Sequence, residues 1–158
     1  MAKNNYTVEQ FIHIIAPYVV LEYQLSRILP SVTLAQAIIE SRYGNSAPGN
    51  NLFGIKGSYK GSSQLLKTTE YVNGKYIKVY AKFRKYPNWY ESIADHSWLL
   101  CSNKRYKNVI GCKEYILACQ HLKAAGYATA PDYDVTLIKC IETYNLTRFD
   151  EEAIKNYG

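Results

Sequence analysis

Glu40 ends an apolar stretch whose character could make it an acid catalyst. The stretch TLAQAIIESRYG, residues 33–44, carries no charge before Glu40. If these residues form a helix, Glu40 lies in its last turn, where the helix dipole disfavours a negative charge. The neighbours Ile38 and Ile39 would also desolvate the carboxylate, and both effects raise its pKa. A carboxylic acid that stays protonated near neutral pH can donate a proton to a leaving oxygen, as glycosidases require.

Glu70 is a second carboxylate that could take part in such a reaction. It precedes Asn73-Gly74, a dipeptide that predicts a tight β-hairpin turn and pairs Glu70 with Ile77. If its face of the hairpin looks toward Glu40, Glu70 could activate a water or stabilise an oxocarbenium-like centre. Judged from the residues alone, a solvated helix-end glutamate and an exposed strand glutamate are the more ordinary interpretations of the two positions.

The elements that must hold these carboxylates are indicated by capping and turn signals. The sequence predicts helices opened by Thr7, over 33–44 with a capping box at Thr33–Gln36, from Asn88 to Leu100, over 112–125 and over 132–144. A hairpin lobe over about 62–86 is inserted between the second and third helices. Pro17 is expected to kink the first helix or to start its second half, and the tail over 151–158 is expected to be loosely held. The result is a single α+β domain over residues 1–158, mostly helical, with a small β lobe beside a substrate cleft.

The charge and the aromatic content indicate the kind of partner. A net charge of +6 favours an anionic partner, either nucleic acid or a bacterial wall that carries acidic polymers. The 16 tyrosines could stack on sugar rings, although composition alone slightly favours core filling as their role. No apolar run is long enough to span a bilayer, so stable membrane insertion is not expected. The first residues do not read as a signal peptide, so we expect release from a host cytoplasm or membership of a longer chain.

The cysteines and histidines show no metal-ligand spacing. None of Cys101, Cys112, Cys119 and Cys140 forms a CxxC pair, and the three histidines are scattered. We therefore expect no metal site and no cofactor. Disulfides are not needed in a chain of this length, so buried free thiols are the expectation.

The motifs, taken together and in order, resemble those of glycoside hydrolase family 73. They are LAQAIIESRYG, NNLFGIKG, TTEY, FRKYPNWYESIADHSWLL and GYATAPDY, and they run from about Pro30 to Tyr144. The resemblance implies a lysozyme-like fold and a bacterial or phage peptidoglycan hydrolase, mostly an endo-β-N-acetylglucosaminidase. Such an enzyme cuts the β-1,4 bond between N-acetylglucosamine and N-acetylmuramic acid in the bacterial cell wall. A monomeric phage lysis enzyme that binds peptidoglycan and no nucleic acid is the expectation that follows.

The resemblance also assigns roles to residues. It implies that Glu40 is the general acid, which replaces the ordinary interpretation of that position, and that Glu70 is the second functional carboxylate. It implies substrate-binding roles for Asn51, Phe53, Tyr127 and Tyr133. Neither an inverting mechanism nor attack by the N-acetyl group of the substrate is favoured by the sequence.

Two departures from the family pattern lie close to these positions. Arg42-Tyr43 replaces a usual Gly-Trp pair, and a cation there could alter substrate fit or the pKa of Glu40. Ala130 replaces a usual aspartate after the G-Y-A-T motif, which weakens a helix cap unless Asp132 or Thr129 substitutes for it.

Other function classes explain less of the sequence. A nucleic-acid-binding domain would cluster its basic residues on one face, but here most of them spread from Lys56 to Lys155, and no motif of a known nucleic-acid-binding domain is present. A cysteine peptidase would need a histidine motif to partner Cys112, and none is present. A silent sugar-binding domain would not need an intact Glu40. A muramidase or a lytic transglycosylase of the same fold stays open as an alternative.

Overall fold

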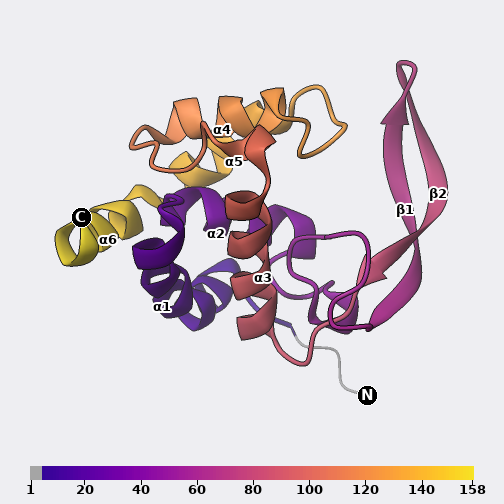
Figure 1. Ribbon diagram of the computed structural model, residues 1–158, viewed down its shortest axis with the longest axis horizontal. Helices are drawn as coiled ribbons and strands as arrows, with labels where there is room; N and C mark the ends of the chain where they lie inside the picture. The colour runs from indigo at the N-terminus through magenta and orange to yellow at the C-terminus, as the bar shows by residue number, and fades with distance from the viewer. Residues whose placement is uncertain (1–4) are drawn as a thin grey trace.

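Six α-helices and one β-hairpin make up residues 5–158, the part of the chain that the computed structural model describes (Figure 1). The helices are α1 (Val8–Ser26), α2 (Pro30–Ser41), α3 (Trp89–Ser102), α4 (Tyr115–Ala124), α5 (Tyr133–Thr143) and α6 (Thr147–Tyr157). The hairpin consists of β1 (Ser63–Val72) and β2 (Lys75–Arg84), and two short 3-10 turns are η1 (Pro48–Asn50) and η2 (Lys104–Tyr106). This arrangement confirms the predicted α+β class, mostly helical with a small β lobe.

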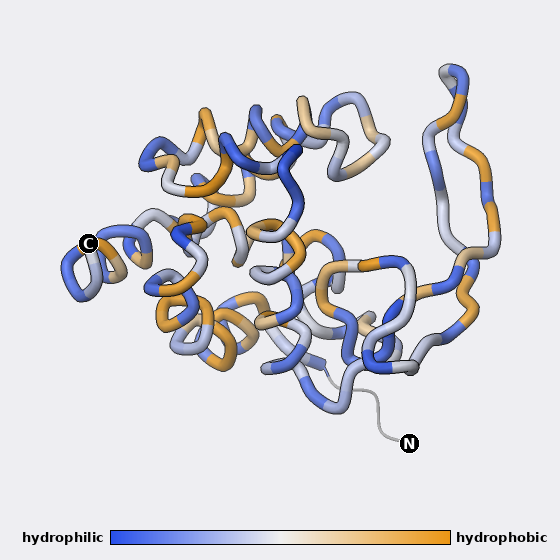
Figure 2. The backbone as a smooth tube through the Cα atoms, viewed as in Figure 1, coloured by the Kyte–Doolittle hydropathy of each residue, from blue (hydrophilic) through white to orange (hydrophobic). Residues whose placement is uncertain are grey.

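Helix α2 is the buried centre of the fold. Ten of its 12 residues are buried, and it packs against α1, α4, α5 and α6. Apolar segments are frequent along α1 and its neighbours in Figure 2, whereas hydropathy changes repeatedly along the hairpin. The core therefore lies among the helices, and the hairpin lies outside it.

The start of α2 corrects the capping box that was predicted at Thr33. The helix begins three residues earlier, at Pro30, because proline is well suited to a first helical position. Asp150 of α6 caps it from a distance, since its carboxylate accepts the Ser31 N–H at 2.7 Å and the Ser31 hydroxyl at 2.6 Å. Thr33 and Gln36 are consequently buried inside the helix.

The chain end corrects a second prediction. The tail is not loosely held but forms most of α6, which packs against α1 and α2. Asp150 and Ala153 of this helix are buried. The burial of its inner face explains the order, because tertiary packing rather than local propensity stabilises most short helices.

Helix α1 confirms its predicted start and continues through its proline. The Thr7 hydroxyl accepts the Gln10 N–H at 3.1 Å and the Gln10 side chain accepts the Thr7 N–H at 2.9 Å, which completes the capping box. Pro17 lies inside a continuous helix on its exposed face. The carbonyl that the proline leaves without a donor can therefore be hydrated there.

The β-hairpin has the predicted turn and register. Asn73 and Gly74 have φ of 50° and 78°, which fits the type I′ turn of a two-residue hairpin. Glu70 pairs with Ile77, as predicted. At the base, Asp95 of α3 accepts hydrogen bonds from Arg84 at 2.7 Å and from Tyr86 at 2.6 Å. This end of the hairpin is thus anchored to α3, while the turn extends away from the helices (Figure 1).

The remaining local predictions are mostly confirmed. Asn88 caps α3 by accepting the Glu91 N–H at 2.9 Å, and Asn145 ends α5 with a left-handed φ of 51°. All four cysteines are free thiols, but only Cys119 and Cys140 are buried. Among residues 5–158, no helix is long and apolar enough to cross a membrane.

Candidate active site

Glu40 lies in the last turn of α2, where it meets the loop that follows η1. Ser41 is the last helical residue, and Arg42 caps the helix in a left-handed conformation. Gly54 passes over the carboxylate, since a Cβ at that position would stand 3.4 Å from Oε2 of Glu40. Gly54 also has a φ of 62°, so a larger residue would be strained and would crowd the carboxylate.

The surroundings of Glu40 favour its protonated form. Burial raises the pKa of Glu40 to about 7, and the charge of Glu70 adds to the rise. The side chain is nevertheless exposed to solvent by surface area. The two properties are compatible because many protein atoms lie around the carboxyl group while part of the side chain stays open to solvent. A large fraction of Glu40 therefore keeps its proton at neutral pH while the side chain stays accessible, and an acid catalyst needs both properties.

Glu70 lies on β1 and is held from two sides. It forms an ion pair with the ammonium group of Lys56, which lies in the loop before β1. The Thr129 hydroxyl, in the loop between α4 and α5, donates to Oε2 of Glu70 at 3.1 Å. The same hydroxyl accepts the Tyr71 N–H at 3.1 Å. The hairpin is thus tied to the helical part of the molecule at Glu70 as well as at its base.

Tyr127 and Tyr133 form an aromatic pair near Glu40. Their rings stack with centroids 5.9 Å apart and an interplanar angle of 9°. Burial raises the pKa of each tyrosine well above its usual range, and the charge of Glu40 contributes to both shifts. The Tyr127 hydroxyl is buried and has no hydrogen-bond partner among the described residues. The structure thus brings both predicted aromatic residues to the acid.

A buried polar chain behind the tyrosines was not predicted. Gln36 donates from Nε2 to the Tyr133 hydroxyl at 2.9 Å, and its Oε1 lies 2.8 Å from Nε2 of His96. Burial lowers the pKa of His96 to about 3, so the imidazole is neutral. Gln36 was interpreted as part of a cap. A usable signal was its place four residues before Glu40, which puts both side chains on one face of the helix.

Asn51 and Phe53 support the site from behind in this structure. The Asn51 amide is used by the backbone, since it donates to Ile55 O at 2.9 Å and Arg84 O at 3.0 Å and accepts Ile55 N–H at 3.1 Å. Phe53 is buried and its ring stacks on His96 at 4.0 Å. Their contacts shape the loop that carries Gly54. Direct contact of either residue with a substrate stays a prediction.

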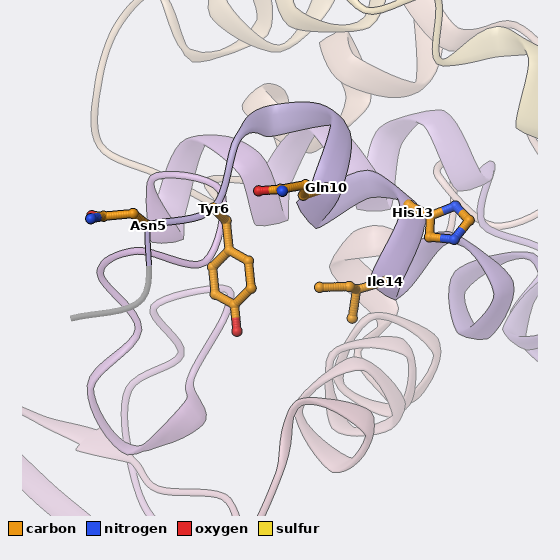
Figure 3. A pocket seen from close by; sticks show the side chains of 5 residues that line it. All are labelled: Asn5, Tyr6, Gln10, His13 and Ile14. Atoms are coloured by element: carbon orange, nitrogen blue, oxygen red, sulfur yellow. The ribbon is translucent and has the colours of Figure 1, made fainter. Parts of the chain in front are cut away.

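Two hollows elsewhere on the surface do not share this chemistry. One lies at the start of α1, where Tyr6, Gln10 and His13 line it with Asn5 and Ile14 (Figure 3). The other lies between α1 and α6 and is lined in part by Glu9, Arg148 and Glu152. Neither includes Glu40, Glu70 or the tyrosine pair, so we place the candidate site by its chemistry. Within residues 5–158, no three histidine, cysteine or acidic side chains gather closely enough to hold a metal ion.

Known proteins are similar to this chain in sequence and in architecture. The sequence profile of the family Glucosaminidase, described as mannosyl-glycoprotein endo-beta-N-acetylglucosaminidase, matches residues 16–146. The exo-glucosaminidase LytG of Bacillus subtilis is 41% identical over 149 residues, which cover 89% of this chain and 53% of LytG. The peptidoglycan hydrolase FlgJ of Escherichia coli K12 is 40% identical over 147 residues, which cover 87% of this chain and 46% of FlgJ.

A solved structure extends the similarity to the fold. The catalytic domain of the autolysin Auto from Listeria monocytogenes superimposes with a TM-score of 0.78 at 35% identity. The superposition covers 94% of this chain and 90% of that domain. The predicted lysozyme-like fold is confirmed by this similarity. The chain spans about half the length of the two curated relatives named above.

Proposed function

The chain belongs to the glucosaminidase family, and from this membership we propose that it hydrolyses bacterial peptidoglycan. The proposed reaction cleaves the β-1,4 bond between N-acetylglucosamine and N-acetylmuramic acid. One observation carries the proposal: a glutamic acid with a pKa raised to about 7 is accessible at the end of the most buried helix, with a second carboxylate close enough to influence it. Two carboxyl groups that flank a glycosidic bond are what this reaction requires.

In the proposed mechanism, Glu40 is the general acid. Its raised pKa keeps the proton in place near neutral pH, and the proton passes to the oxygen of the leaving sugar as the glycosidic bond breaks. Tyr127 and Tyr133 form an apolar wall beside this carboxyl group and favour its neutral form. Tyr127 is the partly exposed member of this pair, so its ring is the one that a sugar can contact.

Glu70 has an assisting role in the same proposal. If a water molecule fits between the two carboxylates, Glu70 takes a proton from that water, which attacks the anomeric carbon with inversion. If Glu70 stands too far away to activate that water, the carbonyl oxygen of the substrate's own N-acetyl group attacks the anomeric carbon as the glycosidic bond breaks. Water then opens the cyclic intermediate and restores the N-acetyl group, and the charge of Glu70 stabilises the positive charge that develops at the sugar. Measuring the anomeric configuration of the first product by NMR distinguishes inversion from the retention that attack by the N-acetyl group would give.

The test of the function is digestion of purified peptidoglycan by the wild type and by Glu40→Gln. We expect the wild type to release reducing ends and the variant to release almost none. Mass analysis then identifies the sugar at the new reducing end, which is N-acetylglucosamine for the proposed activity. N-acetylmuramic acid at that end would assign a muramidase, and its anhydro form a lytic transglycosylase. No release by a folded wild type would refute the proposal.

The pattern of cleavage along the glycan is a separate part of the proposal. We propose cleavage inside the strand, as the description of the family profile suggests, although LytG is named an exo-glucosaminidase. Internal cleavage shortens glycan strands to mixed lengths early in the digest. Release of only the shortest fragments from the start would show that the enzyme works from chain ends.

The setting of the activity is proposed from charge. A protein with a net charge of +6 is attracted to anionic wall polymers, and we propose that it acts there as a monomer, without nucleic acid, in phage-type lysis. Expression inside a bacterium should then lyse the cells only when the membrane is permeabilised by a second protein. Lysis by the enzyme alone would argue against this setting and leave the activity itself unaffected.

A further inference from the structure

The Thr129 hydroxyl makes two contacts across the space between the lobes. It donates to Oε2 of Glu70 and accepts the N–H of Tyr71, each at 3.1 Å. A hydroxyl has one proton to donate and lone pairs to accept, so both bonds can form at once. Thr129 thereby grips the side chain of the second carboxylate and the backbone next to it.

The hairpin register explains why Tyr71 is free to make this contact. Val72 pairs with Lys75 across the two-residue turn, and Tyr71 pairs with Tyr76 next to them. Hydrogen-bonded and non-hydrogen-bonded pairs alternate in an antiparallel ladder, and the pair that closes a two-residue turn is hydrogen-bonded. The Tyr71 N–H therefore points away from β2, along the open edge of the strand. Thr129 docks on that edge.

The contact matters because little else holds this part of the hairpin. The base is fixed to α3 through Asp95, but Glu70 lies near the turn, and a two-stranded ribbon alone is only marginally stable. The ion pair of Glu70 with Lys56 is a second restraint, but the lysine side chain is 54% exposed. Exposed ion pairs contribute little, because water and salt screen them. The two bonds of Thr129 are exposed too, but they also hold the backbone next to Glu70, which the lysine does not.

Thr129 does not serve the loop in another visible way. Ala130 stands where the family usually has an aspartate, and Asp132 precedes α5 without a side-chain capping bond. The Thr129 hydroxyl does not replace that cap, since its two bonds go to the hairpin. The residue is exposed, so its loss would leave no cavity in the core.

We propose that Thr129 is a positioning residue that holds Glu70 in its working place opposite Glu40. It acts through Glu70 and does not itself touch the bond that breaks. This inference rests on the proposed function, because it matters only if Glu70 takes part in glycoside hydrolysis. The loop between α4 and α5 then sets both the aromatic wall, through Tyr127, and the second carboxylate, through Thr129.

The test compares Thr129→Val, which keeps the shape and removes the hydroxyl, with Thr129→Ser, which keeps the hydroxyl. We expect Thr129→Val to lower kcat on peptidoglycan about tenfold, as loss of a hydrogen bond to a charged group would, with the melting temperature unchanged. Thr129→Ser should keep at least half of the wild-type activity, because it keeps the hydroxyl. Wild-type activity in Thr129→Val would overturn the inference. Equal losses of activity in Thr129→Val and Thr129→Ser would overturn it as well.

A pH profile separates positioning from a general structural effect. Glu40 faces Glu70, Tyr127 and Tyr133, while Glu70 faces Lys56 and Thr129, and Lys75 shares its side of the hairpin. If Glu70 drifts away in Thr129→Val, less negative charge opposes ionisation of Glu40. The basic limb of the rate profile should then move to lower pH, in the same direction as in Glu70→Gln. The inference would be contradicted if the basic limb of the rate profile moves in Glu70→Gln and stays in place in Thr129→Val.

A double variant completes the design. In the Glu70→Gln background, Thr129→Val should cause little further loss, because the residue that it positions has been altered already. A second full tenfold loss would show that Thr129 acts independently of Glu70. The proposed function is judged separately by Glu40→Gln. If that variant keeps wild-type activity, the function fails, whereas an inactive Glu40→Gln with a fully active Thr129→Val rejects only the positioning role.

Discussion

The carboxylate of Glu70 on β1 raises the pKa of Glu40 at the end of α2. The two side chains belong to different lobes, so the raised pKa depends in part on how the hairpin stands against the helices. Burial of Glu40 is the larger cause and is built into the helix end. The raised pKa therefore has one cause in the helical part of the molecule and a second in the hairpin.

Glu40→Gln is expected to abolish most of the activity while the fold persists. Glutamine keeps the shape of the side chain and cannot donate the proton, and loss of a general acid costs about 10²- to 10⁴-fold in rate. The measurement is release of reducing sugars from peptidoglycan, with circular dichroism as the control for folding. Near wild-type release by the variant would remove Glu40 from the mechanism.

The rate is expected to fall as pH rises through about 7. Glu40 must be protonated to act as an acid, and its pKa is raised to about 7. Glu70→Gln removes a charge that opposes ionisation of Glu40, so the basic limb should move to lower pH, with a lower maximal rate. Profiles of kcat/KM on soluble wall fragments measure both effects. A limb that moves to higher pH would contradict the assigned coupling.

Local signals predicted the hairpin turn and most helices, because each depends on residues close in sequence. The backbone preferences of Asn73 and Gly74 determine the hairpin turn. Thr7 caps α1 through a capping box with Gln10, only three residues further along the chain. The predicted start of α2 was wrong because the residue that caps the helix, Asp150, belongs to α6 at the other end of the chain. A contact between residues so distant leaves no local pattern.

For the candidate site, too, the sequence predicted the residues that a local motif marks and missed those that depend on tertiary contacts. Glu40 and Glu70 were predicted because a family motif marks them, and the apolar run before Glu40 fits its raised pKa. Gln36 and His96 were missed because their meeting depends on how α2 packs beside α3. Thr129 was considered only as a cap, since nothing in the sequence places its loop against the edge of β1.

The stability of Glu40→Gln relative to the wild type is expected to increase with pH. Folding raises the pKa of Glu40 from 4.5 to about 7, so the folded state holds a proton that the unfolded state loses in this window. The wild type therefore loses folding stability as the pH rises from about 4.5 to 7, whereas Glu40→Gln does not lose this contribution. We expect a gain of about 1 kcal/mol at pH 8, because solvent reaches the carboxylate and screens it.

Thermal unfolding of both proteins at pH 5 and pH 8 measures this difference. The comparison cancels the contributions of Asp150 and His96, whose pKa values are also shifted by burial. A gain of about 1 kcal/mol corresponds to a rise of roughly 2–4 °C in Tm for a domain of this size. An equal difference in Tm at both pH values would show that ionisation of Glu40 does not oppose folding.

Tyr127→Phe and Tyr127→Ala are expected to separate stability from activity. The Tyr127 hydroxyl is buried without a partner, so Phe should leave the melting temperature unchanged or raise it. Activity should still fall in Tyr127→Phe, because the buried hydroxyl is part of the surroundings of Glu40 and the two groups influence each other electrostatically. Ala also removes the ring that stacks on Tyr133 and should lose more activity together with about 2–4 kcal/mol of stability. Full activity of Phe would limit Tyr127 to packing.

Wall binding is expected to weaken steeply with salt. The net charge of +6 attracts anionic wall polymers, and charges separated by more than about 10 Å are screened at 0.1 M salt. The inactive Glu40→Gln variant permits a sedimentation assay with intact walls, since it does not digest them. We expect most protein to pellet at low ionic strength and little at 0.5 M. Walls stripped of their anionic polymers provide the control, and binding to them should be weak throughout. Binding that resists salt on both kinds of wall would instead assign the affinity to sugar contacts at the site, through Tyr127 and Tyr133, and would leave the charge without a role in targeting.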